Sequence, residues 1–126
     1  MNSDLSEEDL RGLRTEFFIE ALEMMDDLEP MLLEIEKGDA SDMLREVKNL
    51  IHSLKGAASS SGLPQVSDVV HKLETYIEAH EKQIDSGFVS NILKFIDVMR
   101  QTSDLFEEGN LDNFDDVAGN FISLIA

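Results

Sequence analysis

Residues 41–62 read SDMLREVKNLIHSLKGAASSSG, and this stretch decides the fold. Its apolar side chains recur at spacings of three and four residues, which is the period of an amphipathic helix. We therefore expect a helix from about Ser41 to Ser61, with Gly62 as its C-terminal stop. The residues expected on its buried face are Leu44, Val47, Leu50, Ile51, Leu54, Ala57 and Ala58.

The helical spacing continues on the N-terminal side of this stretch. A first helix should begin near Ser6, whose hydroxyl can cap it in a reciprocal pair with Asp9, and should run to Gly38. Pro30 lies within it, so this helix is expected either to kink or to split there. Its inward stripe is expected to consist of Leu10, Leu13, Phe17, Phe18, Ala21, Leu22, Met25 and Leu28.

The C-terminal half carries three more helical patterns. Pro64 stands where a third helix would start, and its buried face would run from Val66 to Ile77. The last two helices are expected at Phe88–Glu108 and at about Asn113–Ile125. Connections of about two to six residues favour antiparallel neighbours. The expected fold is all-α, an up-down antiparallel four-helix bundle with an additional fifth helix, forming a single domain over residues 1–126.

Composition excludes several classes of function. The formal net charge of −17 would repel phosphate backbones and anionic lipids, so neither nucleic acid nor membrane is an expected partner. No apolar run approaches the length that spans a bilayer, and no signal peptide follows Met1. The chain has no cysteine, so it forms no disulfides and no thiolate metal sites. We expect a cytoplasmic monomer whose partners are proteins.

The outward side of the helix at residues 41–61 carries a basic stripe. It consists of Arg45, Lys48, His52, Lys55 and Ser59, which three- and four-residue spacing places on one face. From residue 43 to residue 73 there are four basic and two acidic residues, a local charge of about +2 in an acidic chain. Something anionic is expected to bind there.

His52 is the candidate reactive group of this stripe. A neutral imidazole nitrogen is nucleophilic near pH 7, and the bond it forms to phosphorus stays labile enough to pass the group on. Lys55, one turn further along, could hold phosphoryl oxygens as a point charge. Gly56 and Ser59 offer little bulk where a partner would approach, although Gly56 could equally be a packing glycine.

A longer motif surrounds this histidine. The string Ile51-His52-Ser53-Leu54-Lys55-Gly56, followed by Gly62, resembles the H-x-x-K-G-x-x-x-x-x-G signature of histidine phosphotransfer (HPt) domains. With His71-Lys72-Leu73-Glu74 on the next predicted helix, the chain is similar over nearly its whole length to the N-terminal phosphotransfer domain of chemotaxis histidine kinases.

The resemblance implies a role for each matching residue. His52 would be phosphorylated, and Glu74 would accept a hydrogen bond from one of its ring nitrogens and leave the other as the nucleophile. Lys55 matches the lysine of the family, and His71 matches a second histidine that joins the polar network without being phosphorylated. His80 matches nothing in the family pattern and is expected on the surface. The serines at residues 59–61 depart from the family, which affects the docking preference.

We expect a phosphoryl carrier without an ATP site, because the chain contains no glycine-rich phosphate cradle. A separate sensor or chemotaxis-type histidine kinase, or a phosphorylated receiver, would load His52. The group would then pass to an aspartate of a response-regulator receiver domain, which supplies its own Mg²⁺. No cofactor and no metal are expected on this chain, and docking is expected to use Arg45, Lys48, Gly56 and Ser59.

Three alternatives remain open from the sequence. A metal-binding bundle would normally carry repeated Glu-x-x-His pairs, whereas only the reversed pair formed by His71 and Glu74 occurs here. A helical scaffold would bind a partner without phosphoryl chemistry. Within the phosphotransfer hypothesis, Met1 and the final apolar helix favour a stand-alone relay protein, but a segment of a larger chemotaxis-type kinase would look the same. The kinase, the regulator and the pathway are not specified.

Overall fold

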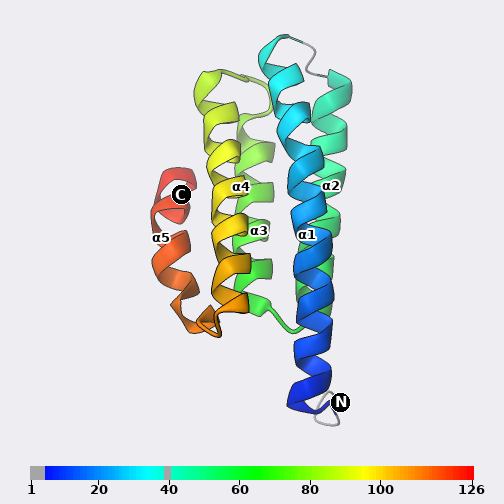
Figure 1. The fold of residues 1–126 in the computed structure, drawn as a ribbon. Helices are drawn as coiled ribbons and strands as arrows, with labels where there is room; N and C mark the ends of the chain where they lie inside the picture. The colour runs from blue at the N-terminus through cyan, green and yellow to red at the C-terminus, as the bar shows by residue number, and fades with distance from the viewer. Residues whose placement is uncertain (1–4, 39–40) are drawn as a thin grey trace.

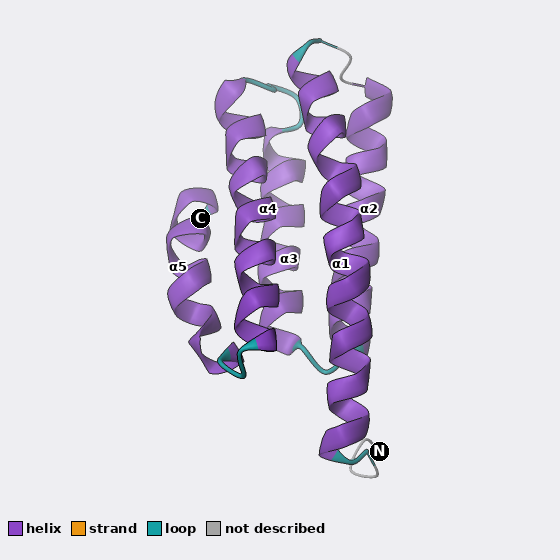
Figure 2. Ribbon diagram, viewed as in Figure 1, coloured by secondary structure: helices purple, strands orange, loops and turns teal. Residues whose placement is uncertain are grey.

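The computed structural model describes residues 5–38 and 41–126, and these form five α-helices. The all-α prediction is confirmed, and Figures 1 and 2 show the helices joined by short loops. The elements in chain order are α1 (Glu7–Glu36), α2 (Ser41–Ser60), α3 (Pro64–His80), α4 (Ser86–Glu107), a short 3₁₀ helix η2 (Leu111–Asn113) and α5 (Phe114–Ile125).

Four of these helices pack side by side as an antiparallel bundle. α1 contacts α2 and α4, and α3 contacts the same two helices, so α1 and α3 stand at opposite corners. In Figure 1, α1 and α4 face the viewer while α2 and α3 lie behind them. The fifth helix, α5, packs outside the bundle against α4 and α3. The bundle therefore has an α1–α4 face and, on the opposite side, an α2–α3 face.

The start of α1 is fixed by the predicted cap. The backbone N–H of Asp9 donates to the hydroxyl of Ser6 at 3.0 Å, and the N–H of Ser6 donates to the carboxylate of Asp9 at 3.4 Å. Two donors that the first helical turn would leave unpaired are thereby satisfied. The capping prediction is confirmed.

Pro30 does not split the first helix, so that alternative is wrong. α1 continues through it to Glu36, although a proline inside a helix removes one backbone hydrogen bond. Pro30 is exposed, whereas Leu28 and Leu32 on either side of it are fully buried. Burying these side chains stabilises the helix on both sides of the proline, and tertiary packing therefore outweighs the local preference.

The N-terminal end of α1 lies outside the core. Figure 1 shows this end extending past the other helices, and buried side chains on α1 begin only at Phe17. Leu13, predicted to face inward, is 36% exposed, because it lies on the part of α1 that precedes the buried stretch. From Phe17 onward the inward stripe packs into one hydrophobic core shared by all five helices.

Gly62 ends α2 as predicted. Its φ is +71°, a conformation that glycine adopts without the strain that a side chain would cause. The N–H of Leu63 donates back to the carbonyl of Ala58, which closes the helix, and Nη2 of Arg14 donates to the carbonyl of Gly62 at 2.6 Å. The turn that connects α2 to α3 is therefore tied to α1.

No helix in the described part of the chain is long and apolar enough to cross a membrane.

Candidate functional site

The α2–α3 face carries the predicted site. Ile51 and Leu54 on α2 are fully buried, as is Leu73 on α3, and these side chains fix how the two helices face each other. Since His52 follows Ile51 directly, its side chain points away from the core, and its side chain is 71% exposed. Packing thus holds the backbone of His52 rigidly while leaving the ring open to a partner.

One ring nitrogen of His52 has a hydrogen-bond partner, and the other has none among the residues that the structure describes. Nδ1 lies 2.9 Å from Oε2 of Glu74, whose own side chain is only 18% exposed. An ionised carboxylate only accepts hydrogen bonds, so Nδ1 must carry the proton and donate it. In the neutral ring Nε2 then has a free lone pair. The Glu74 contact therefore sets both the tautomer and the orientation of the ring.

Glu74 also binds the lysine of the motif. Nζ of Lys55 lies 2.6 Å from Oε1 of Glu74, and Nδ1 of His71 lies 3.7 Å from the same oxygen. Partial burial works against the charge of Glu74, but the hydrogen bonds and charges of Lys55 and His52 outweigh it and hold the pKa of Glu74 below its ordinary value. The structure thus brings His52, Lys55 and His71 around the ionised carboxylate of Glu74, the fourth predicted residue.

The predicted docking residues all lie on α2, but they differ in whether they are exposed or already paired within the chain. Arg45, Gly56 and Ser59 are exposed. Nζ of Lys48 instead donates to both carboxylate oxygens of Glu81, the residue that directly follows α3, at 3.0 and 3.4 Å. The charge of Lys48 is therefore already partly neutralised within the chain.

Gly56 is open rather than packed. No described atom outside its own helix lies within 4 Å of the position where a Cβ would stand. The alternative that it serves as a packing glycine is wrong. Its lack of a side chain leaves free space on the surface one turn beyond His52.

Sequence reasoning missed two residues beside His52. A surface cavity of about 440 Å³ adjoins the imidazole, with Asn49 and Glu78 on its lining and the buried side chains of Ile51 and Ile77 below. Asn49 precedes His52 by three residues and Glu78 follows Glu74 by four, so helical spacing alone could have placed both there. The cavity gives the site an apolar floor next to its polar groups.

His80 lies apart from this cluster, as expected. It is exposed, and its Nδ1 lies 2.8 Å from the carbonyl of Tyr76, whose ring stacks against it at 4.2 Å. No group of three or more histidine, aspartate or glutamate side chains within residues 5–38 and 41–126 could hold a metal ion.

The sequence of the chain is similar to a protein-family model and to several known proteins. The family model described as the Hpt domain matches residues 12–104. The chemotaxis protein CheA of Borreliella burgdorferi is 30% identical over 112 residues, which are 86% of this chain and 13% of that protein. The sensor histidine kinase CheAY of Helicobacter pylori is 28% identical over 97 residues, or 74% of this chain and 12% of that protein.

A third relative is the chemotaxis protein CheA of Salmonella typhimurium. It is 27% identical over 104 residues, which cover 79% of this chain and 15% of that protein. The chain therefore spans less than a fifth of the length of the curated relatives it matches. No solved structure matches it significantly.

Proposed function

Because the chain belongs to the Hpt domain family, the phosphoryl carriers of two-component signalling, we propose that His52 is the residue that carries the phosphoryl group. The observation that supports this most directly is the contact of Nδ1 with Glu74 at 2.9 Å on a ring that is 71% exposed. One nitrogen is held by the protein and the other faces outward, as an exchange with a second protein requires.

The transfer step follows from this arrangement. The lone pair of Nε2 attacks the phosphorus of an aspartyl phosphate on a receiver domain, and the bond from phosphorus to the aspartate oxygen breaks. The aspartate leaves as a carboxylate, and His52 keeps the Nδ1 proton on the side of Glu74. The ring becomes positively charged as the new bond forms, so the ionised carboxylate of Glu74 stabilises it. The same step in reverse returns the group to a response regulator.

Lys55 adds positive charge beside the pair formed by His52 and Glu74. Its ammonium lies one helical turn from His52 and pairs with Glu74 at 2.6 Å. We assign it the role of offsetting the negative charge that arrives with the phosphoryl group, and His71 that of a polar neighbour of Glu74. The Mg²⁺ used in such transfers would sit on the receiver.

The loading protein is a histidine kinase or a phosphorylated receiver, and the accepting protein is a response regulator. The named relatives are two chemotaxis proteins and a sensor histidine kinase, which supports a chemotaxis-type kinase as the source. A stand-alone relay protein and the phosphotransfer part of a larger kinase both agree with this proposal. Docking would use the exposed residues Arg45, Gly56 and Ser59 together with the cavity beside the ring.

The test is the substitution His52→Gln, with His80→Gln as the matched control. Each protein is incubated with a receiver domain that carries radiolabelled acyl phosphate, and acid-labile label on the chain is counted. His52→Gln should abolish labelling with unchanged helical circular dichroism, while His80→Gln should label normally. If His52→Gln still acquired label, another residue would be the phosphorylation site, and His71 would be tested first. A chain that binds the receiver but never acquires label would instead be a scaffold.

A further inference from the structure

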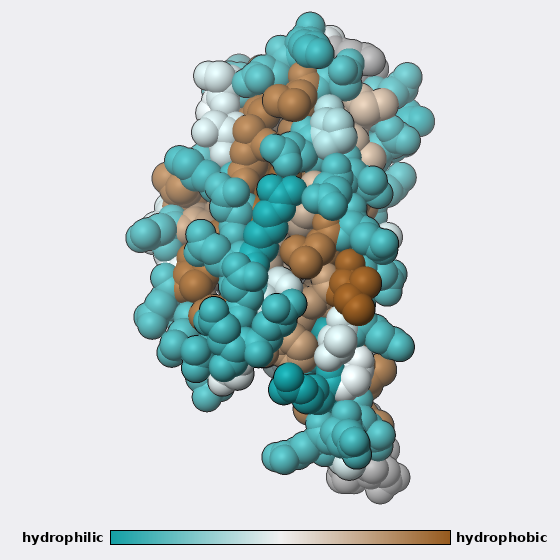
Figure 3. All heavy atoms as spheres, viewed as in Figure 1, coloured by the Kyte–Doolittle hydropathy of each residue, from teal (hydrophilic) through white to brown (hydrophobic). Residues whose placement is uncertain are grey.

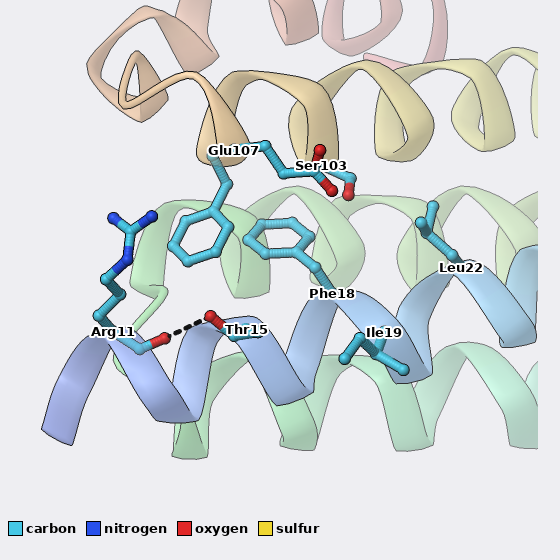
Figure 4. Close-up of a pocket in the computed structure, with 8 residues that line it drawn as sticks. Arg11, Thr15, Phe18, Ile19, Leu22, Ser103 and Glu107 are labelled. Atoms are coloured by element: carbon cyan, nitrogen blue, oxygen red, sulfur yellow. Dashed lines mark hydrogen bonds between the residues drawn. The ribbon is translucent and has the colours of Figure 1, made fainter. Parts of the chain in front are cut away.

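A second concave surface lies on the opposite side of the bundle from His52. It is a cavity of about 220 Å³ between α1 and α4. Its apolar lining comes from Phe18, Ile19 and Leu22 on α1 and Phe106 on α4, and its polar lining comes from Arg11 and Thr15 on α1 and Ser103 and Glu107 on α4. Figure 4 shows Phe18 and Leu22 pointing from α1 toward α4. We call this surface the α1–α4 groove.

Exposed apolar surface adjoins this cavity. The rings of Phe18 and Phe106 stack at 5.0 Å in its lining, the Arg11 guanidinium lies 5.4 Å from the centre of the Phe106 ring, and Ile19 beside them is 59% exposed. Figure 3 shows patches of apolar atoms near the line where α1 and α4 meet, with hydrophilic side chains between and around them. A single exposed isoleucine is ordinary on a protein surface. Here it lines the same cavity as the stacked rings of Phe18 and Phe106, so an exposed aliphatic side chain and two aromatic rings share one concave surface.

Negative charge surrounds the α1–α4 groove. Residues 7–36 contain eleven acidic and two basic residues, a net charge of −9. Glu16 and Glu23 lie three residues before and four residues after Ile19, so both are its neighbours on the helix surface, and both are exposed. The lining itself carries one charge of each sign, Glu107 on α4 and Arg11 on α1, so the negative excess comes from the surrounding surface of α1. A partner that buries an apolar side chain here must approach through a negative field, and this favours a positively charged partner.

The same observations disfavour other occupants. A second copy of this chain would bring two acidic α1 surfaces together, and like charges in contact cost several kcal/mol. A small molecule normally needs a pocket of about 300–1,000 Å³, which is larger than this one. A groove between two helices that takes one aliphatic side chain is instead typical of an amphipathic helix bound through its apolar face.

From this geometry we propose that the α1–α4 groove docks an amphipathic helix of a partner protein, which inserts an aliphatic side chain beside Ile19 and flanks it with lysines or arginines. The surface lies opposite the α2–α3 face, as the bundle in Figure 1 shows. The partner therefore leaves His52 accessible, and the chain can be tethered through one face while it exchanges a phosphoryl group through the other.

The experiment uses the whole chain and a synthetic amphipathic helical peptide built only of leucine and lysine. Backbone amide NMR shifts locate the binding, and fluorescence anisotropy gives the affinity. Shifts should cluster around residues 15–22 and 103–107. A peptide of equal charge with serine in place of leucine should bind at least about 10-fold more weakly, since burial of an aliphatic side chain contributes about 1.5–3 kcal/mol.

The variant Ile19→Ser, with Leu124→Ser on α5 as its matched control, decides the role of the groove. Leu124 is 47% exposed, so neither change should unfold the chain, and circular dichroism checks this. Ile19→Ser should lower the affinity for the leucine–lysine peptide roughly 10-fold, and Leu124→Ser should leave this affinity unchanged. The labelling of His52 should stay normal with peptide bound.

Three results would overturn the proposal. They are shifts centred on the α2–α3 face, equal affinity for the leucine–lysine and serine–lysine peptides, and no loss of affinity in Ile19→Ser. None of them bears on the phosphorylation of His52, which is measured separately.

Discussion

The contact between Glu74 and His52 can be tested by graded removal. Glu74→Gln keeps an acceptor oxygen of similar size but removes the charge, whereas Glu74→Ala removes both. In the present structure the carboxylate accepts from Nδ1 of His52 at 2.9 Å and binds Nζ of Lys55 at 2.6 Å. The two variants therefore separate the orientation of the ring from the stabilisation of its positive charge.

The size of the effect follows from burial. Removing a hydrogen bond to a charged group costs about 1.5–3 kcal/mol. The imidazole is 71% exposed, so water replaces part of the lost interaction and the lower end applies. About 1.4 kcal/mol in the transition state corresponds to a 10-fold change in rate. Glu74→Ala should therefore slow phosphorylation of His52 about 10-fold, and Glu74→Gln should slow it only a few-fold.

The assay is a single-turnover transfer from a phosphorylated receiver, followed by quenching at successive times. Asp68→Asn is the matched control. It also removes the charge of a carboxylate on α3, but the carboxylate of Asp68 pairs with Lys72 and not with His52. Its rate should equal that of the unmodified chain. Circular dichroism and urea denaturation confirm that each variant is folded.

Either of two results would refute the reasoning. Equal rates for Glu74→Ala and the unmodified chain would mean that the ring needs no partner on Nδ1. A larger loss for Glu74→Gln than for Glu74→Ala would mean that the amide holds the wrong tautomer, with Nε2 protonated, and that charge is secondary.

Three further predictions concern docking, the backbone and pH. Glu81→Gln should free Lys48 and strengthen binding to an acidic receiver about 2- to 5-fold at low salt, as measured by titration calorimetry; an unchanged affinity would mean that Lys48 does not face the partner. In urea denaturation, Gly56→Ala should raise the free energy of unfolding by up to about 1 kcal/mol, because a Cβ there meets open space. Gly62→Ala should instead lower it by about 1–2 kcal/mol, because φ is +71°; equal effects would contradict this account. Because the pKa of Glu74 is lowered on folding, its stabilising charge is fully present above the ordinary value of 4.5 and is lost as the pH falls through the lower folded-state value. Unfolding free energies measured across this range should fall more steeply for the unmodified chain than for Glu74→Gln.

The sequence correctly predicted the features that depend on a few neighbouring residues, such as where a helix begins or ends. The cap formed by Ser6 and Asp9 and the glycine stop at Gly62 depend on a few adjacent residues, and both are present. The predicted alternative of a split at Pro30 was wrong, because burial of the side chains on both sides of the proline stabilises the helix. Which side chains are buried depends on how all the helices pack. The inward position predicted for Leu13 was also wrong, since periodicity does not report where along a helix the shared core begins.

Contacts across the site were less predictable. The spacing on α2 placed Lys48, His52 and Lys55 on one face, but it could not indicate which carboxylates of α3 they meet. Only the resemblance to a family pointed to Glu74 as the neighbour of His52. The pairing of Lys48 with Glu81 depends on how α2 and α3 are rotated against each other, and no spacing within one helix encodes that rotation.

The projecting end of α1 has a consequence for how the molecule opens. Amide hydrogens in its first turns should exchange with deuterium quickly by local fraying, because few buried side chains hold them. Amides of α2 and α3 around His52 should exchange only through global unfolding, since their inward side chains are fully buried. The imidazole of His52 is thus carried by helices that should open only when the whole chain unfolds. A label or surface tether attached near residue 7 should therefore disturb the site around His52 little.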